Sequence, residues 1–148
     1  MLGWALAIAP TAAWIGVLGN LSWKPILLST AVASWASSFD IIYHTQDRDY
    51  YIKSGLHSIA QRFGIQGAFR WARVLDIMAV CCLILLGFWM DLSYPYFIGC
   101  LLTSGLILFR YALVSPYNLS KMNVAFYRSN TLVSLTIFIG TLIAIIWV

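Results

Sequence analysis

Apolar residues fall into five long runs along the chain, and short turns or charged segments separate them. Each run approaches the roughly 20 residues that a helix needs to cross a bilayer. The five runs cover residues 2–19, 25–43, 74–90, 94–109 and 130–148. The pattern therefore predicts an all-α fold, a multi-span membrane bundle of five transmembrane helices.

Local residues support two of these expected helices. Pro10 interrupts the first run, but membrane helices tolerate proline better than soluble ones do. Pro25 suits the first position of the second helix, where its missing N–H costs nothing. The second run is rich in small residues from Ser29 to Ser38. Small side chains let helix backbones approach closely, so we expect this helix to pack against its neighbours.

Composition agrees with a membrane protein and changes how the charge is interpreted. The chain has 148 residues, of which 61% are hydrophobic and only 9% are charged. This length allows one domain at most. The net charge of +4 comes from basic residues between the apolar runs, so it indicates no nucleic-acid partner. The three cysteines lie inside apolar runs without the spacing of a zinc site.

The basic residues predict an orientation. One lies in the connection 20–24, five lie in 40–73, none lie in 91–93, and three lie in 110–129. Basic residues are enriched in cytoplasmic loops. We therefore expect the connections 40–73 and 110–129 to face the cytoplasm.

The connection 40–73 begins with an unusual group of acidic residues. Asp40, His44 and Asp47 follow the spacing i, i+4 and i+7, which on a helix places them within roughly 40° of one face. Carboxylates at the edge of a membrane span are costly, so a functional role is the default interpretation. Hard carboxylate oxygens bind Mg²⁺ together with phosphate oxygens, and Arg48 and Lys53 would neutralise the remaining phosphate charge. The alternative is that these charges only solvate a loop. His44 is either a ligand or acid–base group or, as we favour, a packing variation.

The same connection contains a helix-start signal. Ser58 and Gln61 have the spacing of a weak capping box, which predicts a short amphipathic helix over residues 58–63. On that helix Ile59 and Phe63 would face the membrane and Arg62 the water.

Taken together, these residues resemble a known motif. The family pattern Asp-x-x-Tyr-x-x-x-Asp, followed by Gly, Ser and a Phe-Gly ending, is matched by Asp40, Tyr43, Asp47, Gly55, Ser58 and Arg62-Phe63-Gly64. It is similar to the second Asp-rich motif of the UbiA superfamily of intramembrane prenyltransferases. The residues from Phe39 to Gly64 are similar in sequence to the futalosine-type menaquinone subgroup of 4-hydroxybenzoate polyprenyltransferase-like proteins. Asn123, Phe126 and Asn130 also resemble the start of that family's final helix, and the five spans resemble the C-terminal half of its nine-helix fold.

The resemblance implies a reaction and roles for these residues. Members transfer a polyprenyl group from polyprenyl diphosphate to an aromatic acceptor such as 4-hydroxybenzoate in quinone biosynthesis, with Mg²⁺ as cofactor. By this resemblance Asp40 and Asp47 are catalytic metal ligands and Tyr43 lines the pocket. Lys53 and Arg48 would bind the diphosphate. The expected location is the bilayer of a bacterial inner membrane.

Two departures from the family pattern matter. Tyr51 stands where the pattern has a third aspartate, and a phenol keeps its proton at neutral pH. The family's first Asp-rich motif is absent, because the acids outside the connection are Asp76 and Asp91. We expect Asp76 to pair with Arg73 at i−3 and Asp91 to be an interfacial turn residue.

Several explanations therefore remain open. The chain is either an enzyme half that needs a separate N-terminal half with the first motif, or a non-catalytic truncated remnant of the family. A homodimer with two half-sites would still lack the aspartate at Tyr51. A small transporter or scaffold would explain the spans but not the motif spacing.

Overall fold

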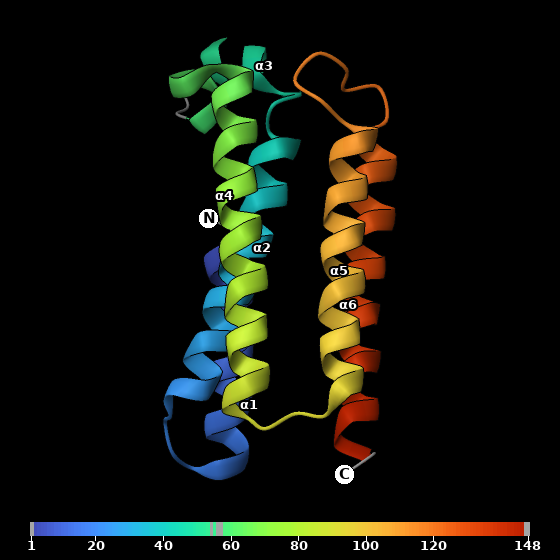
Figure 1. Cartoon of the computed structure of the whole chain (residues 1–148). Helices are drawn as coiled ribbons and strands as arrows, with labels where there is room; N and C mark the ends of the chain where they lie inside the picture. The colour runs from blue at the N-terminus through green and yellow to red at the C-terminus, as the bar shows by residue number, and fades with distance from the viewer. Residues whose placement is uncertain (1, 54, 56–57, 147–148) are drawn as a thin grey trace.

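The computed structural model describes residues 2–53, 55 and 58–146. In this part of the chain there are helices but no named strand, which confirms the all-α prediction. Figure 1 shows an elongated bundle whose long helices run up and down along one axis. The helices are α1 (Leu2–Leu18), α2 (Trp23–Tyr43), α3 (Arg48–Lys53), α4 (Ile59–Trp89), α5 (Tyr94–Leu113) and α6 (Met122–Ile146).

All five expected apolar runs form helices. Four of these helices, α2, α4, α5 and α6, are long and apolar enough to cross a membrane. The fifth, α1, is equally apolar but has 17 residues, or about 25 Å at 1.5 Å per residue. The hydrocarbon core of a bilayer is about 30 Å thick. The chain is a helical membrane bundle in which α1 is the shortest apolar helix.

The helix that contains the third run begins much earlier than predicted. We expected residues 59–73 to belong to a polar connection, but they form the first part of α4. Ser58 is its N-cap and accepts a hydrogen bond from the Gln61 backbone N–H at 3.1 Å, so this half of the capping box forms. The predicted short helix over residues 58–63 forms and ends at Gly64, whose φ of 72° and ψ of 172° are accessible essentially to glycine. Gly64 thus separates the short amphipathic segment from the long apolar one.

The helices form two groups. In one, α2 packs against both α1 and α4, and in the other α5 packs against α6. The second pair is close because Gly99 and Gly140 face the partner helix. A methyl group at Gly140 would lie 3.2 Å from the Pro95 carbonyl oxygen. In the first group, α2 buries its small residues as expected, including Ala31, Ser34, Ala36 and Ser38.

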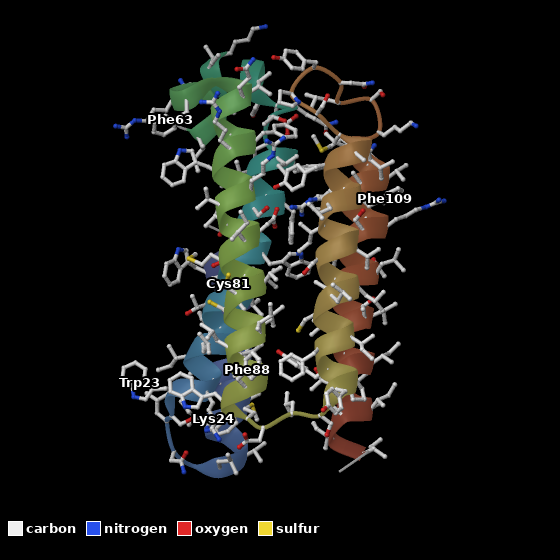
Figure 2. All side chains as sticks on the ribbon, viewed as in Figure 1. Trp23, Lys24, Phe63, Cys81, Phe88 and Phe109 are labelled. Carbon is white, nitrogen blue, oxygen red and sulfur yellow. The ribbon has the colours of Figure 1, made fainter. Side chains whose placement is uncertain are left out.

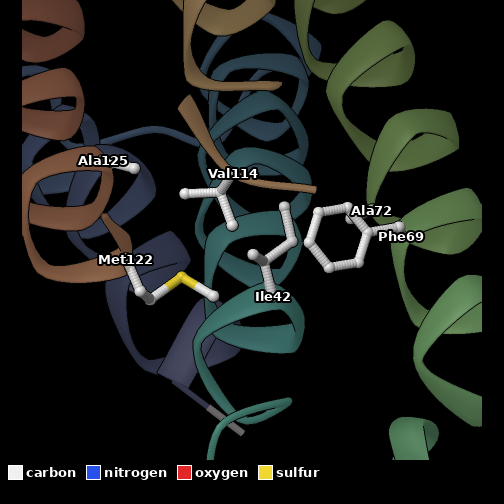
Figure 3. Close-up of a cluster of buried hydrophobic side chains, with 6 residues drawn as sticks. All are labelled: Ile42, Phe69, Ala72, Val114, Met122 and Ala125. Atoms are coloured by element: carbon white, nitrogen blue, oxygen red, sulfur yellow. The ribbon is translucent and has the colours of Figure 1, made fainter. Parts of the chain in front are cut away.

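A buried hydrophobic cluster joins the two groups near one end of the bundle. Its side chains come from α2, α4, the end of α5 and the beginning of α6 (Figure 3). The members are Ile42, Phe69, Ala72, Val114, Met122 and Ala125. Between membrane helices such contacts are stabilised by close van der Waals packing of the side chains. The cluster therefore fixes α6 against the end of α2 that carries the acidic motif.

The two expected basic connections lie at the same end of the bundle. Figure 1 shows α3 and the segment that joins α5 to α6 at one end, and the turn between α4 and α5 at the other. Trp23, Lys24 and Phe88 mark that second end in Figure 2, and Phe63 lies near the first. The alternation of connections agrees with the charge count. The cytoplasmic side remains a prediction.

Candidate functional site

Asp40 lies one turn before the end of α2 and remains partly accessible. Its Oδ1 is 3.2 Å from Nε2 of His44, and the two side chains keep 20% and 37% of their exposure. His44 is the C-cap of α2, and its backbone N–H donates to the Asp40 carbonyl oxygen at 3.0 Å. Next to it, the hydroxyl of Thr45 donates to the Ile42 carbonyl oxygen at 2.6 Å. These local bonds end the helix and hold the Asp40 carboxylate at its margin.

Tyr43 is positioned by an aromatic contact with α6. Its ring lies 4.5 Å from the ring of Phe126, centroid to centroid. Phe126 also contacts Phe39 edge to face at 5.2 Å, and Phe39 contacts Trp35 at 5.1 Å. Aromatic pairs in such geometry contribute about 0.5–1.5 kcal/mol beyond their buried area. The motif residue Tyr43 is thus set by a residue far away in the sequence, in the segment whose pattern resembles the family's final helix.

The prediction that Asp40, His44 and Asp47 share one helical face is wrong for Asp47. The helix ends at Tyr43, and residues 44–47 form a turn. The local hydrogen bonds of His44 and Thr45 replace the next helical turn, so the helical periodicity stops there. Asp47 is exposed in this turn, and Lys53 is exposed at the end of α3. The placements of the Arg48 and Tyr51 side chains fall outside the described part of the structure.

The residues at this end fit part of a Mg²⁺ site. Mg²⁺ accepts one or two carboxylates and completes its shell with water and phosphate oxygens. Asp40 and Asp47 offer such oxygens, one at a helix end and one in an exposed turn. Within the described residues, however, no three histidine, cysteine or acidic side chains form a group able to hold a metal. A Mg²⁺ ion at this end would need further ligands beyond these two carboxylates.

A second charged cluster lies inside the bundle, and the sequence analysis missed it. Arg110 forms a buried ion pair with Asp76 and also donates to the Ser38 hydroxyl at 3.0 Å. The Tyr111 hydroxyl donates to the same Asp76 oxygen at 2.5 Å. This network, formed by Ser38, Asp76, Arg110 and Tyr111, connects α2, α4 and α5 and is called the buried ionic network below.

The prediction that Asp76 pairs with Arg73 is therefore wrong. The Arg73 guanidinium instead lies over the Tyr111 ring, 5.3 Å from its centroid. Asp76 lies midway along α4, where Arg110 from the neighbouring helix can reach it. One signal for this pair was available, since ionisable residues within apolar helices are expected to have buried partners. The apolar pattern placed Arg110 in a connection rather than in a helix, which hid this signal.

A large apolar groove runs along the first helix group. It has a volume of about 710 Å³ and is lined by α1, α2 and α4. Its lining includes Ile41 and Ile59, and Ile41 directly follows Asp40 in the chain. Apolar grooves with a polar group at one end suit ligands that carry a charged head and a hydrocarbon tail.

Comparison with known proteins gives relatives of one kind. The chain is 29% identical over 144 residues to a 4-hydroxybenzoate octaprenyltransferase of Tolumonas auensis, covering 97% of this chain and 50% of that protein. It is 30% identical over 129 residues to one of Marinobacter nauticus, covering 87% and 44% of the two chains. For one of Francisella tularensis subsp. novicida the identity is 25% over 143 residues, with coverage of 97% and 50%.

The chain thus spans about half the length of the curated relatives it matches. No solved structure matches it. The profile of the UbiA prenyltransferase family matches residues 1–146, which include α2, the acidic turn and the beginning of α6. On this match, the chain belongs to the UbiA prenyltransferase family.

Proposed function

We propose that this chain is the diphosphate-binding half of a membrane prenyltransferase of quinone biosynthesis. The reaction would transfer a polyprenyl group from polyprenyl diphosphate to an aromatic acceptor like 4-hydroxybenzoate. The allylic carbon–oxygen bond to the diphosphate breaks, a carbon–carbon bond to the ring forms, and the ring loses a proton. The observation that carries the proposal is the accessible Asp40 carboxylate at the end of α2, inside the matched family region.

The acidic end of the bundle supplies groups for the diphosphate. Asp40 and Asp47 would hold Mg²⁺, which when bound neutralises charge on the diphosphate oxygens. Lys53 is exposed at the same end and would pair with the remaining phosphate charge, together with Arg48. Tyr43, fixed against Phe126, would line the pocket beside the allylic carbon. The orientation predicted from the basic residues of the connections would put this end of the bundle in the cytoplasm.

The apolar groove between α1, α2 and α4 would hold the polyprenyl tail. Its volume of about 710 Å³ and its position beside Ile41 suit a hydrocarbon chain whose head lies near Asp40. An apolar wall also keeps water from the allylic cation that forms when the diphosphate leaves. The serine and threonine residues of α2 in this lining are small, and the larger side chains beside them, such as Ile8, Ile15 and Leu75, are apolar.

Completion of the site requires a first Asp-rich motif from elsewhere. Within this sequence no second motif of that spacing exists. The motif would come either from residues of a longer protein or from a separate chain that packs beside α1 and α2. The relatives' greater length is consistent with both arrangements.

The proposal is tested by coexpression in membranes that lack prenyltransferase activity. The chain would be produced together with the N-terminal half of the Tolumonas auensis relative, and transfer of an octaprenyl group to 4-hydroxybenzoate would be measured with and without Mg²⁺. We expect product that depends on Mg²⁺ and on both halves. Asp47→Asn should abolish it, whereas Asp91→Asn, in the turn at the opposite end, should not.

Two outcomes would decide against an active enzyme. Absence of product with the unchanged chain decides against activity of this chain, and product that Asp47→Asn leaves intact contradicts the assignment of the acidic end. Tyr51→Asp addresses the alternative of a non-catalytic remnant. If only this variant gives product, the native chain is a remnant and Tyr51 is the cause of its inactivity.

A further inference from the structure

A second groove lies between α4 and α5 and has no role in the proposed reaction. Its volume is about 500 Å³, and it differs from the first groove in its lining. One part is polar, formed by Arg73, Asp76 and Tyr111, and the rest is apolar, formed by residues such as Ile77 and Leu108. The groove is therefore mainly apolar, with its charged residues at one end.

The polar part carries a net positive charge. Arg110 already neutralises Asp76 in the buried ionic network. Arg73 remains exposed, stacked on the Tyr111 ring at 5.3 Å, and no carboxylate among the described residues pairs with it. Cation–π stacking fixes the guanidinium while its N–H groups stay available. Guanidinium groups held in this way suit phosphate oxygens.

A second feature of the polar part is an unused acceptor. Asp76 is 3% exposed, and its Oδ1 has no hydrogen-bond partner among the described residues. The other oxygen, Oδ2, accepts from both Arg110 and Tyr111. A buried carboxylate oxygen without a donor is costly. Because this oxygen is enclosed by protein atoms, a molecule in the groove does not reach it, and the charge available to a ligand is that of Arg73.

The apolar part opens on the outer surface of the bundle. Ile77 is 64% exposed and Leu108 is 70% exposed, which in a membrane-spanning helix means contact with acyl chains. A molecule in this groove therefore comes from the bilayer and runs parallel to the helices. Arg73 and Tyr111 lie toward the end of the bundle that carries the basic connections, where a phospholipid head would lie.

We propose that the groove between α4 and α5 binds an anionic glycerophospholipid, with phosphatidylglycerol as the best fit. Its phosphate would pair with Arg73, and one acyl chain would follow Ile77 and Leu108. Charge complementarity at Arg73 distinguishes this lipid from zwitterionic phosphatidylcholine. This site is separate from the diphosphate site, so its test does not depend on enzymatic activity.

Cys81 provides the probe. It is exposed and lines this groove, whereas Cys82 and Cys100 are buried. Figure 2 shows it about halfway along the bundle, at the depth of acyl chains. The chain would carry Cys82→Ala and Cys100→Ala, be labelled with bimane at Cys81, and be reconstituted in vesicles. Quenching of bimane by acyl-brominated phosphatidylglycerol would be compared with quenching by acyl-brominated phosphatidylcholine.

We expect roughly fivefold stronger binding of phosphatidylglycerol, the size of one cation's interaction with an anionic membrane surface. Arg73→Gln should remove this preference and Arg73→Lys should keep most of it. Arg128→Gln is the matched control, because Arg128 is an exposed arginine on α6 outside the groove. It should leave the preference unchanged.

Three results would overturn the proposal. The first is equal quenching by both lipids in the unchanged chain. The second is an equal loss of preference in Arg73→Gln and Arg128→Gln, which indicates general surface charge. The third is disappearance of quenching when the N-terminal half of the Tolumonas auensis relative is coexpressed, which indicates that protein covers the groove.

Discussion

Asp40 and Asp76 are both carboxylates on apolar helices, yet the bundle surrounds them differently. Asp40 lies near a helix end, keeps 20% of its side-chain exposure and pairs with a residue four positions away. Asp76, on α4, keeps 5% of its side-chain exposure and is bonded by Arg110 and Tyr111 of α5. A partly hydrated carboxylate can still accept an ion or a substrate, whereas one enclosed by its own partners cannot readily do so. The comparison separates a carboxylate available for chemistry from one that holds helices together.

The largest effect should come from breaking the buried ionic network. Arg110→Met leaves Asp76 buried without its cation, which costs about 3–5 kcal/mol of stability. The double variant Arg110→Met with Asp76→Leu should recover most of that loss, because no unpaired charge remains. Thermal unfolding in detergent, followed by tryptophan fluorescence, measures both. A double variant as unstable as the single one would show that Asp76 does not depend on Arg110.

The second effect concerns activity rather than stability. Asp40→Asn should reduce prenyl transfer by about 100-fold or more, since it removes one proposed ligand of the metal that stabilises the leaving group. Its unfolding temperature should stay close to that of the parent, because Asp40 is partly exposed and its partner is local. The coexpression assay and a thermal scan measure the two quantities. A large fall in stability would make Asp40 a structural residue like Asp76.

A smaller effect should follow from Tyr111→Phe. The change removes one hydrogen bond to Asp76 and retains the ion pair with Arg110. Interhelical hydrogen bonds within membranes contribute about 0.6 kcal/mol on average and at most about 1.7 kcal/mol. The unfolding temperature in detergent should therefore fall much less than it does for Arg110→Met. The phenyl ring of the variant can still stack with Arg73, so phosphatidylglycerol binding at the groove should largely persist. Loss of phosphatidylglycerol binding would instead show that the Tyr111 hydroxyl takes part in it.

The smallest effect should come from His44→Ala. A helical pair at i and i+4 contributes about 0.2–0.5 kcal/mol. Stability should thus change within that range, measured by the same thermal scan. The activity assay sharpens the comparison: a drop similar to that of Asp40→Asn would make His44 a participant in the site rather than a local partner of Asp40.

Patterns within one segment were sufficient to identify much of the fold. Apolar runs predicted the helices, and Ser58 with Gln61 predicted a cap that the structure contains. Charge counting placed two connections on one side, and Figure 1 shows them at one end. The helices and the cap depend on neighbouring residues, through local sterics and hydrogen bonds, and the side of each connection depends on its basic residues. The acidic motif could also be recognised within one segment, since its residues lie close together in sequence.

Only the tertiary structure decided which distant residues meet. Asp76 and Arg110 are 34 positions apart, and either could have paired with a nearer charge. Tyr43 contacts Phe126 because the hydrophobic cluster brings the beginning of α6 to the end of α2. The spacing of Asp40, His44 and Asp47 also suggested a helical face that continues to residue 47, but α2 ends at Tyr43, where His44 and Thr45 bond back to its last turn. Such choices depend on which side chains fit together across helices, and this complementarity has no periodic signature in the sequence.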